Sequence, residues 1–88
     1  MEHAIYTTYI VECADHTLYI GWTTDIARRV EEHNGSTKGA KYTKPRRPVV
    51  LRYSEAFASE REARRREYAL KRLKRNEKLA LFAAIRKK

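Results

Sequence analysis

The first 27 residues contain no lysine or arginine, although the whole chain of 88 residues has twenty of these bases. All twenty lie in residues 28–52 and 60–88. The base-free segment is instead rich in β-branched and aromatic residues, which favour strands. The sequence therefore predicts that the N-terminal third forms the centre of a sheet, and that the segments packed around it supply the positive charge.

The overall charge points to a polyanionic partner. The formal net charge is +9 and the isoelectric point is about 10, which is typical of proteins that bind nucleic acid. A solvated basic surface without a function is the alternative. Binding to a membrane surface is disfavoured, because the basic segments alternate with apolar core positions instead of forming one basic amphipathic face.

The remaining composition favours a cytoplasmic protein that forms one domain over residues 1–88. The single cysteine, Cys13, excludes an internal disulfide framework and fits a reducing compartment. The N-terminus lacks a signal-peptide pattern. No apolar run approaches the roughly 20 residues that span a bilayer.

The pattern along the chain predicts an α/β protein of the α+β type, with the order ββαβαα. Strands are expected at 5–13 and 18–22, joined as a hairpin, and at 49–53. A helix at 26–33 is expected to be capped by Thr24 or Asp25 and to end at Asn34 and a left-handed Gly35. Residues 35–48 form one long loop, which is functional or disordered.

Two more helices complete the predicted architecture. Ser59 opens a capping box for a helix that continues to about Arg75, and Asn76 is expected to cap the last one. The apolar face of that last helix comprises Leu79, Phe82, Ala83 and Ile85. The result is a small, mainly antiparallel sheet of three strands flanked by helices.

The first helix places two functional side chains beside each other. At about 100° per residue, Arg29 and His33 are neighbours one turn apart on the sheet-facing side, whereas Arg28 points elsewhere. A guanidinium at the margin of an apolar stripe needs a counter-charge or an acceptor. His33 alone is typical of an ordinary buried histidine, so the hypothesis of a functional site depends on Arg29 and His33 together.

Glu67 has two interpretations. It lies at the margin of the stripe set by Ala63 and Leu70, where it could pair with Lys71 in the favourable i, i+4 order. Alternatively, its carboxylate binds a hard divalent cation at the edge of the sheet. Arg66 also falls within the stripe, where it either snorkels to solvent or pairs with an acid.

The two strand tyrosines require a test of register. Tyr9 and Tyr19 share a face of the sheet only if the hairpin loop has an odd number of residues, such as Ala14-Asp15-His16. Half-buried packing is the ordinary role for either ring. Gly21 interrupts the second strand, which indicates a bulge or a close approach by another backbone or a ligand.

Together these residues resemble the GIY-YIG nuclease domain, and most closely its small stand-alone bacterial forms. Tyr19-Ile20-Gly21 matches the second half of the motif literally, and Thr7-Thr8-Tyr9 stands where Gly-Ile-Tyr would be. Arg29 follows Tyr19 by ten residues, as the essential arginine of the family does. His33 lies one turn later, and Glu67 matches the metal-binding glutamate. The family's late asparagine has no clear match, since Asn76 is doubtful in spacing.

The resemblance implies metal-dependent hydrolysis of phosphodiester bonds with one Mg²⁺ or Mn²⁺ at Glu67. Arg29 would hold the phosphate, Tyr9 or Tyr19 would activate water, and His33 would orient or accept the proton. DNA is favoured over RNA, cleavage could depend on the structure of the nucleic acid, and a partner protein could supply targeting. The expected nucleic-acid contacts are Arg28, Lys38, Lys41, Lys44, Arg46, Arg47, Arg64, Arg65 and Lys71. The main rival is a non-cleaving nucleic-acid-binding module, followed by a protein-interaction subunit.

Overall fold

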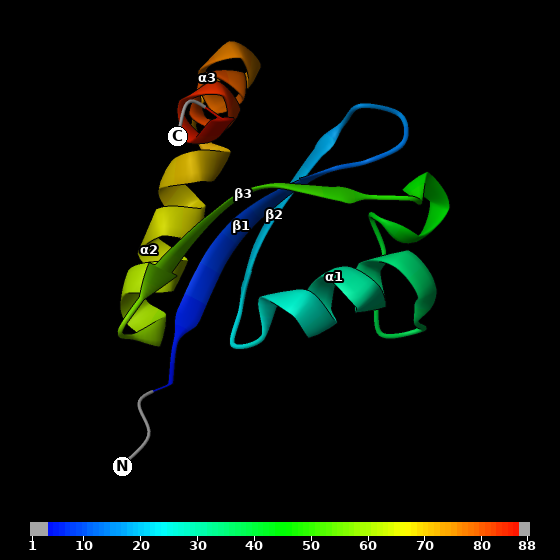
Figure 1. The fold of residues 1–88 in the computed structure, drawn as a ribbon, viewed down its shortest axis with the longest axis horizontal. Coiled ribbons are helices and arrows are strands. Elements are labelled where there is room, and N and C mark those ends of the chain that lie inside the picture. Colours follow the sequence, from blue (N-terminus) through cyan, green and yellow to red (C-terminus); the bar gives the residue numbers. More distant parts are fainter. Residues whose placement is uncertain (1–3, 87–88) are drawn as a thin grey trace.

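The computed structural model describes residues 4–86, with side chains as far as Ala83. The elements in chain order are β1 (Tyr6–Glu12), β2 (Leu18–Thr23), α1 (Ile26–Gly35), the short 3₁₀ helix η1 (Lys44–Arg46), β3 (Val50–Phe57), α2 (Glu60–Lys71) and α3 (Arg75–Arg86). The predicted order ββαβαα is confirmed. The three strands form an antiparallel sheet in the order β2-β1-β3 (Figure 1). The base-free segment thus supplies the central strand, β1, and the edge strand β2.

Helices cover both faces of the sheet, with α1 on one side and α2 and α3 on the other (Figure 1). Because side chains alternate along a strand, β1 contributes to two separate cores. Tyr9 and Val11 pack on the α1 side, and Ile10 packs with Leu70 of α2 on the opposite side. The candidate active site belongs to the α1 side.

The hairpin register places both tyrosines on one face. Tyr9 lies opposite Gly21, and Val11 lies opposite Tyr19. Beyond the last pair, the amide of Cys13 donates to the carbonyl of Thr17 at 2.8 Å. The hairpin loop therefore consists of three residues, 14–16. His16 in this loop adopts the left-handed conformation with φ of 69°. The odd-length loop confirms the condition under which Tyr9 and Tyr19 share a face.

The two ends of α1 differ in how well the sequence predicts them. Asp25 is the N-cap, and its side chain accepts from the amide of Arg28. The prediction of a left-handed Gly35 is wrong, because Gly35 is the last helical residue and no described glycine has a positive φ. The guanidinium of Arg47 instead satisfies the carbonyls of Glu32, His33 and Ser36. A side chain from a distant segment therefore does what a left-handed cap usually does.

The third strand is longer than predicted, because it continues beyond residue 53 to Phe57. The sequence did not indicate this continuation, because Glu55 places a charge at an inward-facing position of the strand. Its carboxylate accepts from Tyr53 Oη at 2.8 Å and from Arg66 Nε at 2.9 Å. Of the two roles left open for Arg66, the structure therefore supports pairing with an acid.

The junction between the last two helices also differs from the prediction. Ser59 caps α2 as expected, but α2 ends at Lys71 instead of about Arg75. Leu73 then packs into the core beside Leu70. Asn76 lies inside α3 and is therefore not its N-cap. At the start of this helix, the Glu77 carboxylate accepts from the amide of Lys74 at 2.8 Å. The predicted apolar position Ile85 lies outside the residues whose side chains are described.

The long loop after α1 is ordered by its own contacts. Thr43 within it is fully buried, and Arg46 accepts through its carbonyl from the amide of Ala14 at 2.9 Å. The loop therefore joins the hairpin turn to the end of α1. Among the described helices, none is both long and apolar enough to cross a membrane.

Candidate active site

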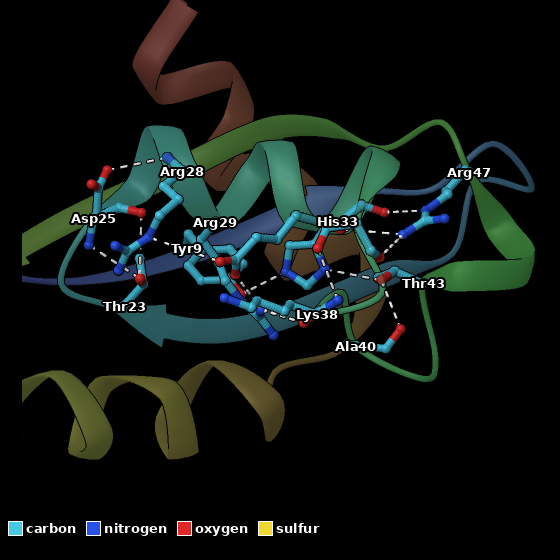
Figure 2. A network of polar contacts seen from close by, with 12 residues as sticks. Tyr9, Thr23, Asp25, Arg28, Arg29, His33, Lys38, Ala40, Thr43 and Arg47 are labelled. Carbon is cyan, nitrogen blue, oxygen red and sulfur yellow. Dashed lines mark hydrogen bonds and ion pairs between the residues drawn. The ribbon is translucent and has the colours of Figure 1, made fainter.

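A buried hydrogen-bond chain links β1, α1 and the loop that comes after α1. Tyr9 Oη lies 2.8 Å from His33 Nε2, and His33 Nδ1 lies 2.9 Å from Thr43 Oγ1. Thr43 Oγ1 donates in turn to the carbonyl of Ala40 at 3.0 Å. The exposed fractions of Tyr9, His33 and Thr43 are 1%, 0% and 0%. Figure 2 shows the chain running from Tyr9 through His33 to Ala40.

This chain assigns the tautomer of His33. A threonine hydroxyl has one proton, and the proton of Thr43 is directed to the Ala40 carbonyl. His33 Nδ1 must then carry the hydrogen that it shares with Thr43, which leaves Nε2 as an acceptor. Tyr9 therefore donates its hydroxyl proton to His33 Nε2. The direction of the whole chain runs from Tyr9 toward the loop.

The same burial sets the protonation states. Burial raises the pKa of Tyr9 to about 12, opposed by the hydrogen bond and the charge of Arg29, while the charges of Tyr19 and Glu67 raise it further. Burial, together with the positive charge of Arg29, lowers the pKa of His33 to about 4. At neutral pH the pair is a phenol hydrogen-bonded to a neutral imidazole.

Gly21 makes room for the Tyr9 ring. A Cβ at position 21 would lie 2.7 Å from Tyr9 Oη and 3.0 Å from its Cζ. Gly21 pairs in register with Tyr9, so it is not a bulge. The close approach expected at Gly21 is real, but the approaching group is the side chain of Tyr9 and not a backbone or a ligand. The glycine lets the phenol cross β2 and reach His33.

Arg29 is held beside Tyr9 by contacts within its own helix and loop. Its Nη1 donates to Glu32 Oε1 at 2.8 Å and to the carbonyl of Lys38 at 2.9 Å. The Arg29 side chain is 24% exposed, so the guanidinium is positioned but still reachable. Arg28 is more exposed, at 63%, and makes only a longer ion pair with Glu32, 3.8 Å from Nε to Oε2. The choice of Arg29 over Arg28 made from the helical wheel thus agrees with the geometry.

Tyr19 occupies the open side of the same cluster. Its ring packs edge-on against the His33 ring at 5.2 Å between centroids and stacks with Tyr42 at 6.0 Å. The Arg46 guanidinium lies 3.9 Å above the centroid of the Tyr42 ring. Tyr19 is half-buried, unlike Tyr9, and lines a groove open to solvent. The two tyrosines therefore share a face but occupy different environments.

Glu67 approaches the cluster from α2. Its carboxylate pairs with Lys71 Nζ at 2.9 Å, as the simpler of its two interpretations predicts, and its charge acts on Tyr9. Within residues 4–83 no group of three or more histidine, cysteine, aspartate or glutamate side chains could enclose a metal ion. A single carboxylate fits only a hard cation such as Mg²⁺, which retains water and takes substrate oxygens as further ligands.

The basic residues expected to contact nucleic acid lie on three parts of the surface. They belong to α1 (Arg28), to the loop after it (Lys38, Lys41, Lys44, Arg46 and Arg47) and to α2 (Arg64, Arg65 and Lys71). The loop lysines and the α2 group are exposed. Arg64 and Arg65, with Arg61 and Tyr68, line a cleft of about 550 Å³ on α2. The donors of Arg47 are instead used within the fold, at the end of α1.

Three residues of this site were missed from the sequence. Thr43 orients His33, Glu32 tethers Arg29, and Tyr42 stacks on Tyr19. Glu32 had a signal, since it lies three residues after Arg29 on the same helix. Thr43 and Tyr42 lie in an irregular loop, where no periodicity indicates which side chains turn inward.

Comparison with known proteins gives the site a context. A family model described as the GIY-YIG catalytic domain matches residues 5–80. A UPF0213 protein of Desulfotalea psychrophila is 56% identical over 79 residues, spanning 90% of this chain and 72% of the relative. A UPF0213 protein of Halobacterium salinarum is 57% identical over 74 residues, spanning 84% and 95%.

Two solved structures resemble the fold. The solution NMR structure of a UPF0213 protein from Bacillus halodurans shares 45% identity at a TM-score of 0.58, covering 91% of this chain and 84% of that one. The solution NMR structure of a protein from E. faecalis shares 35% identity at a TM-score of 0.59, covering 92% and 88%. Both agree with the order ββαβαα found in this chain.

Proposed function

The chain belongs to the GIY-YIG catalytic-domain family, a nuclease family, and from this premise we propose that it hydrolyses phosphodiester bonds in nucleic acid, DNA in preference to RNA. The observation that carries the proposal is the buried contact between Tyr9 Oη and His33 Nε2, with Arg29 beside it. A phenol, an imidazole and a guanidinium arranged in this way suit proton transfer next to a bound phosphate.

Arg29 receives the scissile phosphate in this mechanism. Its guanidinium is held by Glu32 and by the Lys38 carbonyl, so its position is fixed before substrate arrives. A bidentate contact to two phosphate oxygens stabilises the charge that grows on them in the transition state. The contacts with Glu32 and with the Lys38 carbonyl both use Nη1, so Glu32 keeps the guanidinium in place before substrate binds.

Tyr9 and His33 then carry the proton. Tyr9 accepts a proton from the attacking water as it passes its own hydroxyl proton to His33 Nε2, which the tautomer leaves free to accept it. A phenol with a pKa of about 12 is not ionised at neutral pH, so this concerted transfer replaces a free phenolate. The phosphate also offsets the charge of Arg29, which lowers the pKa of His33 in the free protein. Substrate thereby makes His33 a better base.

Glu67 is the residue that would hold a divalent cation. Such a cation, Mg²⁺ or Mn²⁺, supplies Lewis-acid stabilisation of the leaving oxygen. Lys71 must release Glu67 for this to happen, since the two side chains are paired. The exposed loop lysines, Arg28 and the α2 bases would hold the flanking phosphates without regard to sequence.

The proposal is tested by cleavage of branched, single-stranded and duplex DNA, and of RNA, in Mg²⁺ or Mn²⁺. Arg29→Ala should lower the rate at saturating substrate by about 10²–10³-fold, by analogy with loss of a transition-state donor. Tyr9→Phe should lower it by about 10²–10⁴-fold, as for loss of a general base, and Tyr19→Phe by less than about tenfold. Glu67→Gln should abolish cleavage but retain binding.

Arg28→Ala is the matched control, because it removes a neighbouring arginine that is mostly exposed and contacts the site only through the longer ion pair with Glu32. It should weaken binding slightly and leave the rate at saturating substrate unchanged. Cleavage that survives both Arg29→Ala and Glu67→Gln would exclude the proposed site. Salt-sensitive binding without cleavage of any substrate would favour the rival function, a binding module with the same fold.

A further inference from the structure

A groove beside the candidate active site has a lining that suits one nucleotide. It measures about 280 Å³ and is lined by Leu18, Tyr19, Ile20, Tyr42, Lys71 and Lys78. The edge strand β2 forms one wall, the loop after α1 contributes Tyr42, and α2 and α3 contribute the lysines. Its volume is at the lower end of the range for pockets that take small ligands.

The groove is continuous with the catalytic residues. Tyr19 contacts His33 on one side and lines the groove on the other. Lys71 pairs with Glu67 and also lines the groove. A chain whose phosphate lies between Arg29 and Glu67 therefore has its neighbouring nucleotide at the mouth of this groove.

The chemistry of the lining separates into two parts. Leu18 and the Tyr42 ring offer apolar and aromatic surface above the buried Ile20, which suits the flat face of a nucleobase. Lys71 and Lys78 offer ammonium groups, which suit the phosphate attached to it. The Tyr42 ring is held by its contacts with Tyr19 and Arg46 while the residue remains 37% exposed, so little side-chain freedom is lost when a base binds.

We propose that this groove binds one unpaired nucleotide next to the scissile phosphate, with its base against Tyr42 and Leu18 and its phosphate on Lys78. A base that is paired and stacked in a duplex cannot enter a groove of this size. The substrate class is therefore nucleic acid with at least one unpaired nucleotide at the cleavage position, such as a single strand, a flap or a junction. This inference rests on the proposed function and specifies its substrate.

The test measures binding and not cleavage, by fluorescence anisotropy in EDTA. The probes are oligothymidylate of eight nucleotides, an eight-nucleotide abasic strand with the same charge, and a fully paired duplex. Wild type should bind the oligothymidylate about fivefold to a hundredfold more tightly than the abasic strand, which is the effect of one stacked base. Tyr42→Leu should remove most of that difference and leave affinity for the abasic strand within about twofold.

Two further variants separate base contacts from phosphate contacts. Lys78→Met should weaken the oligothymidylate and the abasic strand equally and reduce the salt slope by about 0.7, the value for one contact to a single strand. Val50→Ala is the control, because Val50 is an exposed apolar residue, at 48%, on β3, at the opposite edge of the sheet from the groove. It should leave the preference for oligothymidylate over the abasic strand unchanged.

A second measurement does not depend on variants. In wild type, the methyl resonances of Leu18 and Ile20 should shift on addition of oligothymidylate and not on addition of the abasic strand. Equal affinity for the two strands, or unshifted methyl resonances, would overturn the groove as a base site even if the protein cleaves DNA. Base-dependent binding in a protein that cleaves nothing would support the groove and refute the proposed hydrolysis.

Discussion

At the scale of single residues, the function of His33 depends on Thr43. An imidazole with two buried nitrogen atoms must donate from one and accept at the other. Thr43 Oγ1 accepts from Nδ1 only because its own proton is directed to the Ala40 carbonyl. Thr43 is therefore a positioning residue that acts through His33 on Tyr9.

Replacing Thr43 tests this role directly. Thr43→Val retains the shape but leaves the Nδ1 hydrogen of His33 without its acceptor, which should cost about 1–3 kcal/mol of stability. Thr43→Ser should retain both the stability and the tautomer. The imidazole ¹⁵N shifts of His33 report the tautomer independently of activity. Thr37→Val, an exposed change in the same loop, is the control, and a wild-type His33 protonated at Nε2 would refute the assignment.

Gly21 provides a second residue-scale prediction. Gly21→Ala introduces a Cβ 2.7 Å from Tyr9 Oη in a fully buried region, so either the phenol or the strand must move. Overpacking of this kind costs about 1–3 kcal/mol, and the contact between Tyr9 and His33 should be lost. The free energy of unfolding from denaturant titration measures the cost.

Two further variants test whether the Tyr9 hydroxyl causes the loss of stability in Gly21→Ala. In the background of Tyr9→Phe, which removes the closest atom, Gly21→Ala should be less destabilising than in wild type. Gly35→Ala is the control, since nothing lies within 4 Å of its Cβ position, and it should be neutral or slightly stabilising. An equal cost for Gly21→Ala in both backgrounds would show that the hydroxyl of Tyr9 is not the obstacle.

At the scale of elements, the sequence predicts most of the features that have a regular period. The strand pattern and the helical wheel placed Tyr9, Tyr19, Arg29 and His33, and the hairpin register confirms that the tyrosines share a face. The capping signals at Asp25 and Ser59 fix the start of α1 and of α2. These predictions succeed because neighbours in sequence determine them.

The features that the sequence did not predict depend on contacts between distant segments. The end of α1 is set by Arg47, the length of β3 by the pairing of Glu55 with Arg66, and the orientation of His33 by Thr43. None of these partners is at a fixed spacing from the residue it serves. The roles of Tyr9, Arg29, His33 and Glu67 in chemistry came from the family resemblance and stay predictions until activity is measured.

Thr8 shows how one departure from the family motif fits the structure. It stands where the motif has isoleucine, and its Oγ1 donates to the carbonyl of Ala63 at 2.7 Å. Both residues are fully buried, so this bond fixes the first turns of α2, the helix that carries Glu67, against β1. The Thr8 hydroxyl thus makes a directed hydrogen bond where an isoleucine side chain would make only apolar contacts.

Thr8→Val should therefore destabilise the protein by about 1 kcal/mol, the usual net value of one hydrogen bond. Amide exchange should also become faster in the first turns of α2, while the rate in α1 is unchanged. Thr7→Val is the control, because Thr7 is half-buried on the opposite face of β1. If Thr8→Val leaves exchange in α2 unaltered, the bond does not anchor that helix.

At the scale of the whole molecule, the buried Tyr9–His33 pair links stability to pH at both ends of the range. The folded pKa of His33, about 4, is below its ordinary value of 6.5, so the unfolded chain binds more protons between these values. The contribution of His33 is therefore complete above about pH 6.5 and is lost as the pH falls toward 4. The folded pKa of Tyr9, about 12, is above its ordinary value of 10, so its contribution is complete below pH 10 and is lost between 10 and 12.

The acidic limb can be assigned to His33. Its complete loss amounts to about 3–4 kcal/mol, at about 1.4 kcal/mol for each unit by which the two pKa values differ. Glu12, Asp15 and Glu32 have lowered pKa values because of hydrogen bonds to their carboxylates, so their contributions begin to be lost only as the pH falls through the ordinary carboxylate pKa values near 4.5 and below, at the end of the series. In a series at pH 7.5, 6.5, 5.5 and 4.5, the free energy of unfolding should therefore change little over the first step and fall over the last two.

Thr37→Val is the control for this pH series, because Thr37 is exposed, carries no titratable group and should not affect the acidic limb. The imidazole resonances of His33 should titrate near pH 4 in the folded protein. A flat stability between pH 6.5 and 4.5, with His33 titrating near 6.5, would show that burial and the charge of Arg29 do not hold His33 neutral. Because nucleic acid should offset the charge of Arg29, a bound strand should shift the same titration to higher pH, which connects the stability of the fold to its proposed chemistry.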